Sequence, residues 1–103
     1  MTEAQLLVEV LELCRRYGLW WFHAYDSRRL VRGDTPDDRT QAGKGWVDLV
    51  IVGNRGAVFA ELKSETERRS MAQIKWAGRL QEAGQTYRLW RPADLDDGTL
   101  SYR

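Results

Sequence analysis

The feature that most constrains this fold lies in residues 47–62, where two apolar segments flank a Gly-Asn-Arg-Gly turn. Such a turn between apolar segments is typical of a β-hairpin. If Gly53 pairs with Gly56, then Asp48 pairs with Glu61 further along the arms. Directly opposed side chains lie about 5 Å apart, and like charges there are destabilising. The hairpin therefore brings two carboxylates together that need a neutralising partner.

A divalent cation is one such partner, because Mg²⁺ is usually held by one or two carboxylates together with phosphate and water. Lys63 follows Glu61 by two residues and shares its face in a strand. A hard cation beside Asp48 would activate water and neutralise charge on a phosphoryl group, and Lys63 would orient that water or stabilise the transition state. The alternative is that Asp48 and Glu61 lie at solvent-exposed strand ends and form surface ion pairs with Lys63 and nearby arginines. A three-residue turn would place the two acids on opposite faces.

The remaining pattern predicts an α/β fold. Capping boxes and hydrophobic periodicity predict further elements on both sides of the hairpin: a helix from Thr2 to about Tyr17, a strand over 19–25, a helix over 70–83 and a strand over 86–90. The second helix is expected to bury Met71, Ile74, Ala77 and Leu80. The order helix, strand, strand, strand, helix, strand predicts one domain over residues 1–103, with a mixed four-stranded sheet and helices packed against it.

Composition excludes several classes of protein. The 103 residues carry 16 Lys and Arg against 15 Asp and Glu, a net charge of +1, so a basic surface has to come from local segregation. Cys14 and His23 are the single residues of their types, which excludes an internal disulfide and a His-rich zinc site. No leader or membrane-length apolar run is present. We expect a cytoplasmic protein with no membrane partner and no organic cofactor.

Residues 26–45 form a long polar loop without apolar periodicity, as functional connections often do. Basic residues in and near this loop are candidates for DNA phosphate contacts, the alternative being an ordinary surface loop: Arg28, Arg29, Arg32 and Lys44, together with His23, Arg68 and Arg69. The chain has five tryptophans. Trp20, Trp21 and Trp46 are candidates for stacking on an unpaired base, for a dimer contact, or for core packing.

The order of an acid, a hairpin turn, Glu-x-Lys and a helix with glutamine resembles the PD-(D/E)xK nuclease superfamily, and more narrowly its VRR-NUC family. The resemblance rests on these residues: Gly45-Trp46-Val47-Asp48-Leu49, Glu61-Leu62-Lys63, Gln73 with Trp76, Ala83-Gly84, Trp90-Arg91-Pro92-Ala93-Asp94, and His23 with Asp26-Ser27-Arg28-Arg29. It implies a restriction-endonuclease-like core and hydrolysis of DNA phosphodiester bonds with Mg²⁺ or Mn²⁺. It also implies selectivity for branched DNA, such as Holliday junctions or flaps, and a homodimer.

The resemblance also implies roles for individual residues. Asp48, Glu61 and the backbone carbonyl of Leu62 would hold the metal, and Lys63 would act on the water and the scissile phosphate. Gln73 would support the site, although it is also the capping partner of Ser70 and could serve either or both purposes.

The chain departs from the family at two positions. Val47 stands where a proline is common, and Gln5 stands where relatives often have a glutamate that contributes to the metal site. Glu9, one turn further along the helix, is the candidate substitute. The alternatives to an active nuclease are a DNA-binding or scaffolding module without turnover, and a nuclease subunit of a restriction or defence system.

Overall fold

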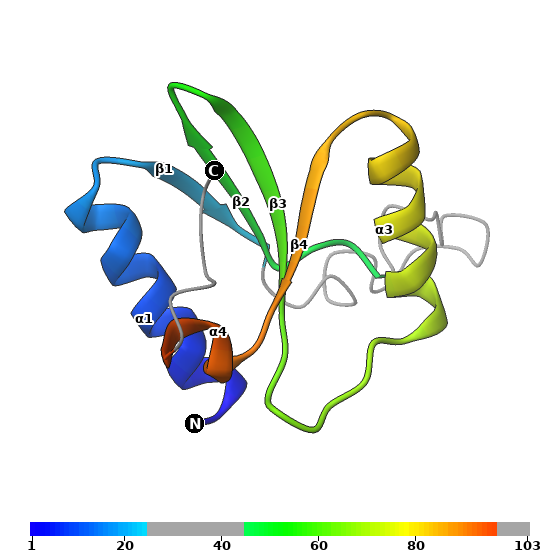
Figure 1. The fold of residues 1–103 in the computed structure, drawn as a ribbon, viewed down its shortest axis with the longest axis horizontal. Helices are drawn as coiled ribbons and strands as arrows, with labels where there is room; N and C mark the ends of the chain where they lie inside the picture. The colour runs from blue at the N-terminus through cyan, green and yellow to red at the C-terminus, as the bar shows by residue number, and fades with distance from the viewer. Residues whose placement is uncertain (25–44, 97–103) are drawn as a thin grey trace, which may run out of the picture.

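A computed structural model of the chain describes residues 1–24 and 45–96 (Figure 1). Its elements are α1 (Glu3–Arg16), β1 (Trp20–His23), β2 (Leu49–Gly53), β3 (Gly56–Leu62), α3 (Met71–Glu82), β4 (Thr86–Trp90) and α4 (Pro92–Asp96). The four strands form one sheet in the order β1-β2-β3-β4, antiparallel from β1 to β3 and parallel between β3 and β4. The predicted mixed α/β architecture and element order are confirmed, and α4 is a short addition after the last strand.

The hairpin has the register that the glycines predict. Gly53 pairs with Gly56 and Leu49 pairs with Ala60, so the loop contains two residues. Beyond the last pair the register is irregular, since the Asp48 amide donates at 3.1 Å to the carbonyl of Ala60, which is the partner of Leu49. Asp48 and Glu61 both lie at the open end of the hairpin, close enough for their carboxyl groups to interact.

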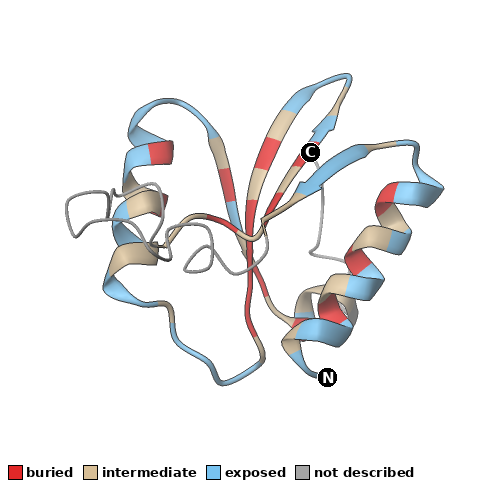
Figure 2. Ribbon diagram, turned by 180° about the vertical axis from the view of Figure 1, so that it is seen from behind, coloured by how far each residue is buried: buried red, intermediate tan, exposed pale blue. Residues whose placement is uncertain are grey.

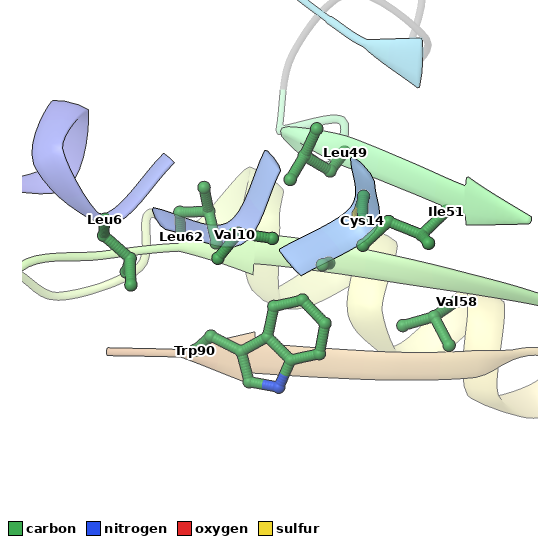
Figure 3. Packing of buried hydrophobic residues seen from close by; sticks show 9 residues of the cluster. Leu6, Val10, Cys14, Leu49, Ile51, Val58, Leu62 and Trp90 are labelled. Atoms are coloured by element: carbon green, nitrogen blue, oxygen red, sulfur yellow. The ribbon is translucent and has the colours of Figure 1, made fainter. Parts of the chain in front are cut away.

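Two clusters of buried side chains cover the two faces of the sheet. On one face α1 inserts Leu6, Val10 and Cys14 against side chains from β2, β3 and β4 (Figure 3). These strand residues are Leu49, Ile51, Val58, Ala60, Leu62 and Trp90. On the other face Ala77 and Leu80 of α3 pack with Val47 and Tyr87. One end of each helix thus comes close to the open end of the hairpin.

The burial of two segments differs from their apolar character. In β2, Val52 is 47% exposed because α3 packs beside β4 and leaves the β1–β2 side of that face open. In α3, Met71 and Ile74 are 69% and 43% exposed, whereas Ala77 and Leu80 are buried. The helix is rotated so that Gln73, rather than Ile74, faces the sheet.

Part of the sequence prediction concerns residues outside the described ranges. The expected polar loop over 26–45 lies almost entirely there, as do the candidate DNA-binding residues Arg28, Arg29, Arg32 and Lys44. The first strand is described as Trp20–His23, shorter than the predicted 19–25. In the described part of the chain no helix has the length and apolar character needed to cross a membrane.

Candidate active site

Asp48 lies where β2 begins, and its carboxylate is fixed by the backbone of the neighbouring strand. The Leu62 amide donates a hydrogen bond of 2.7 Å to Asp48 Oδ2. The Leu62 side chain packs in the core under α1 and is 1% exposed. The core therefore fixes the position of the amide that orients Asp48.

Glu61 is the most buried charged side chain among the described residues, with no exposed surface. Gln73 Nε2 donates to Glu61 Oε2 at 3.0 Å, while Glu61 Oε1 has no hydrogen-bond partner within the described part of the protein. A buried carboxylate oxygen without a partner is destabilising unless something positive or donating reaches it. Such an oxygen next to a second carboxylate fits a hard, oxygen-preferring cation.

Gln73 takes part in the capping box of α3 and also contacts Glu61. Its amide donates to the Oγ of the N-cap residue Ser70 at 3.1 Å, and its side-chain Oε1 accepts from the Ser70 amide at 2.8 Å. The same side chain uses Nε2 for the hydrogen bond to Glu61. Because the capping box restrains the glutamine side chain, it presents a donor to Glu61 in one orientation.

The pKa of Glu61 is raised to about 8, first by burial and then by the charge of Asp48. The positive charges of Lys63 and Arg69 oppose this rise, and Glu3 adds to it. Since the raising influences prevail, the protein by itself does not supply enough positive charge for this carboxylate.

The pKa of Asp48 is also raised, again mainly by burial. The hydrogen bond from the Leu62 amide opposes the rise most strongly. The charges of Lys63 and His23 follow, and then a side-chain hydrogen bond with Glu61. His23, at the end of β1, is therefore close enough to influence Asp48.

The acid that α1 brings to this region is Glu3. Burial and the charge of Asp48 raise the pKa of Glu3 to about 7, a hydrogen bond with Glu67 contributes in the same direction, and Lys63 opposes the rise. The pKa of the exposed Glu67 is instead lowered, chiefly by this hydrogen bond with Glu3. Glu3 thus adds a third carboxylate to the surroundings of Lys63.

Glu9 stays a prediction as the substitute for a missing acid at Gln5, and the structure adds Glu3 as a second candidate on α1. Glu9 and Gln5 are exposed, and Gln5 is engaged in its own capping box, where its Oε1 accepts from the Thr2 amide at 2.7 Å. Glu3 is the first residue of α1 and lies directly after the N-cap. The signal in the sequence was the capping box itself, which marks the helix start and the acid beside it.

Two cations border the acid pair. Lys63 is 9% exposed, and its amide donates to the Trp90 carbonyl at 3.0 Å, which extends the β3–β4 pairing past the strand end. Arg69 Nη1 donates to the Tyr87 hydroxyl at 3.4 Å and lies near enough to Glu61 to lower its pKa. Arg68 is exposed. Tyr87 was not identified from the sequence, because its contact with Arg69 depends on β4 lying beside β3.

Arg91 holds the segment between Lys63 and α3. Its Nη1 donates to the carbonyls of Ser64 and Glu67 at 2.5 and 2.7 Å, respectively. Its own amide donates to Asp94 Oδ2 at 2.7 Å. This arginine was noted only within the family resemblance, and periodicity gives no signal for such a long-range backbone contact.

Gly45 packs closely against the first turn of α3. It has φ +77°, and a Cβ atom there would lie 2.6 Å from the Gln73 amide nitrogen and would also overlap the Ala72 backbone. The chain leading to Asp48 thus contacts the helix start that carries Gln73. This close approach explains why a glycine stands three residues before the motif aspartate.

The cluster contains few metal ligands of its own. Within residues 1–24 and 45–96 no group of three or more His, Cys, Asp or Glu side chains is arranged to hold a metal ion. Two carboxylates with a backbone carbonyl are still sufficient for Mg²⁺, which usually keeps several waters and binds substrate phosphate. The donor set fits a hard cation that is completed by water and substrate. The chain matches no family model, no curated protein and no solved structure.

Proposed function

We propose that this protein is a small metal-dependent DNA endonuclease with a restriction-endonuclease-like core, similar to the VRR-NUC family. The observation that carries the proposal is the open end of the hairpin. There Asp48 lies beside the fully buried Glu61, whose Oε1 has no hydrogen-bond partner among the described residues, and Lys63 follows Glu61 by two residues. Two carboxylates with raised pKa values beside a lysine suit a site that is completed by a divalent cation.

In this proposal Asp48, Glu61 and the Leu62 carbonyl hold Mg²⁺ or Mn²⁺. When bound, the cation supplies an activated water and neutralises charge on the scissile phosphate. Lys63 positions the water and stabilises the negative charge that develops on the phosphate oxygens. Gln73 keeps Glu61 in the orientation that leaves Oε1 available.

DNA is the proposed substrate because Lys63 and Arg69 lie near Glu61 and could contact DNA phosphates. Arg68, exposed on the segment after β3, and His23, near Asp48, are further proposed contacts. Selectivity for branched DNA and a homodimer are proposed from the family resemblance. A four-way junction is symmetric, so a symmetric dimer would present one site to each of two strands.

The test is a cleavage assay with supercoiled plasmid and with labelled single-stranded, duplex, flap and four-way DNA. Cleavage is expected with Mg²⁺ or Mn²⁺ and not with EDTA. D48N keeps an acceptor for the Leu62 amide and E61Q keeps one for Gln73, so both should fold. Each of these variants, and K63A, should lower the cleavage rate by about 100-fold or more.

Matched controls are K75A and E82Q, which alter exposed residues of α3. Both should cleave at the wild-type rate. Absence of metal-dependent cleavage on every substrate would overturn the proposal, as would wild-type rates for D48N and K63A.

A second candidate is a DNA-binding module without turnover. It is favoured by the finding that the described residues contain no group of three or more His, Cys, Asp or Glu side chains arranged to hold a metal ion. Calorimetry with Mn²⁺ separates the two functions. Heat that disappears in E61Q supports the nuclease, whereas no heat together with normal DNA binding supports the module.

A further inference from the structure

An open hollow lies where α1 is joined to β1. In the ribbon, this join is at the opposite end of β1 from the end that lies beside the start of β2 (Figure 1). Its volume is about 430 Å³, and it is lined by Arg15, Gly18, Leu19, Trp20 and Trp21. Ligand sites commonly have volumes of this size. Neither the acid pair nor its supporting residues contribute to this hollow.

Its two tryptophans are not used to build the core. Trp20 is 81% exposed and Trp21 is 39% exposed, and most of β1 is at the surface (Figure 2). The other tryptophans are packed: Trp46 meets Trp76 edge to face with ring centroids 4.8 Å apart, and Trp90 is 3% exposed. Trp20 and Trp21 therefore expose more of their indole rings than the other three tryptophans do.

The hollow has one charged lining residue, the cation Arg15, among the five residues described as lining it. Arg15 pairs with Glu12 at 2.7 Å, but their side chains are 68% and 50% exposed, and such surface pairs contribute little. A phosphate could therefore compete for Arg15. Indole faces beside a guanidinium are the combination that binds single-stranded nucleic acid, with bases stacked and phosphates paired.

Two elements connect the hollow to the acid pair. Strand β1 runs from Trp20 to His23, which interacts electrostatically with Asp48, and its three steps span about 10 Å. Within helix α1, the twelve steps from Glu3, which also interacts with Asp48, to Arg15 span about 18 Å. With a rise of about 3.4 Å per nucleotide, the separation equals roughly three to five nucleotides.

We propose that this hollow binds an unpaired base and its phosphate on the DNA strand that is cut at the acid pair. One of the two indoles, which leave opposite faces of β1, stacks on the base, and Arg15 pairs with the phosphate. The inference rests on the proposed nuclease function and adds a substrate class: DNA with a single-stranded segment roughly three to five nucleotides from the cut site.

Binding is measured first, on the full chain in EDTA, by fluorescence anisotropy with a labelled oligothymidylate of about 12 nucleotides, a usual site size for such binders. The double variant W20A/W21A is expected to weaken binding about tenfold or more, because stacking contributes roughly 1–3 kcal/mol per base. R15A should weaken binding less and should reduce its salt dependence. F22A is the matched control, since Phe22 lies in the same strand, is 65% exposed and does not line the hollow.

Cleavage is then compared on a flapped duplex and on a nicked duplex without a flap. W20A/W21A should lose rate on the flap and keep its rate on the nick. Circular dichroism should show that W20A/W21A and its control F22A are folded, since Trp20 and Phe22 are largely exposed. Wild-type binding by W20A/W21A, or an equal loss in F22A, overturns the inference. A change in sedimentation with unchanged DNA binding also overturns it and identifies the hollow as a contact between copies.

The two proposals fail in different ways. If D48N abolishes cleavage but W20A/W21A binds and cuts like wild type, only the hollow is refuted. If no substrate is cut but binding still depends on Trp20 and Trp21, the nuclease function is refuted and the base-binding hollow is supported.

Discussion

Helices α1 and α3 begin with the same device and use it differently. In each helix a hydroxyl residue and a glutamine three positions later form a reciprocal capping box, with both amide-to-hydroxyl hydrogen bonds at 3.1 Å. Gln5 of α1 is exposed and does no more than cap. Gln73 of α3 also donates to the buried Glu61. A local motif therefore fixes where a helix starts, while the packing of the helix on the sheet decides whether its first turn joins the site.

Helix α1 contributes through a different residue of its first turn. Glu3 interacts electrostatically with Asp48 and Lys63, from the opposite face of the sheet to α3. One helix thus adds a negative charge and the other adds a neutral donor. The two helix starts are expected to respond differently to matched substitutions.

The largest difference is expected at the glycines. G45A would force a Cβ into the Ala72 backbone and the Gln73 amide at φ +77°, whereas a Cβ at Gly18, at φ +69°, meets nothing within 4 Å. G18A should lower the free energy of unfolding by about 1 kcal/mol for the backbone alone. G45A should lower it by roughly 2–5 kcal/mol, because overpacking adds to this term. Urea unfolding followed by tryptophan fluorescence measures both, and equal losses would contradict the close seating of α3.

The next effect concerns Glu61, held by α3, in metal-free protein. Its folded pKa of about 8 lies above the ordinary 4.5. The folded state therefore binds the proton more tightly, and this stability is present below about pH 4.5 and is lost as pH rises through about 8. In EDTA, the free energy of unfolding of wild type should fall between about pH 4.5 and 8. The fall in E61Q should be smaller by on the order of 2 kcal/mol. Parallel pH profiles for the two proteins would contradict the raised pKa.

Local signals in the sequence were sufficient for the hairpin and the helix starts. Gly53 and Gly56 define a two-residue loop, and this loop sets the register that brings Asp48 next to Glu61. Capping boxes are equally local, because they involve residues three positions apart. These predictions needed no knowledge of which elements become neighbours.

The residues that were missed depend on how helices lie on the sheet. Periodicity placed Ile74 in the core, but α3 is rotated so that Gln73 reaches Glu61. Glu3 approaches Asp48 because α1 crosses the sheet with its first turn at the open end of the hairpin. Val52 stays exposed because α3 packs beside β4 and not over β2. A single sequence carries no direct signal for such rotations and offsets.

A smaller effect is expected from the two capping glutamines. Q73A removes a capping interaction and also deprives the buried Glu61 of the hydrogen bond from Gln73 Nε2, so it should cost about 1–3 kcal/mol in the free energy of unfolding. Q5A removes only the cap interaction and should cost about 0.5 kcal/mol or less. If the proposed nuclease function holds, Q73A should also reduce activity or metal affinity about 10–100-fold, as loss of a residue supporting a metal ligand does. Equal effects of Q73A and Q5A on both quantities would show that Gln73 is only a cap.

The smallest effect distinguishes Glu3 from Glu9 on α1. The pKa of Glu3 is raised to about 7, so its contribution to stability is present below about pH 4.5 and is lost as pH rises through 7. In EDTA, E3Q should therefore be more stable than wild type at about pH 8, by less than about 1 kcal/mol because the group is partly screened by solvent, and equal to it at about pH 4. E9Q should follow the wild-type profile at both pH values, since Glu9 is exposed. NMR titration of the side-chain carboxyl carbons gives the pKa of each residue directly. An ordinary pKa at Glu3 with a raised one at Glu9 would show that α1 presents its next turn, rather than its first, to Asp48.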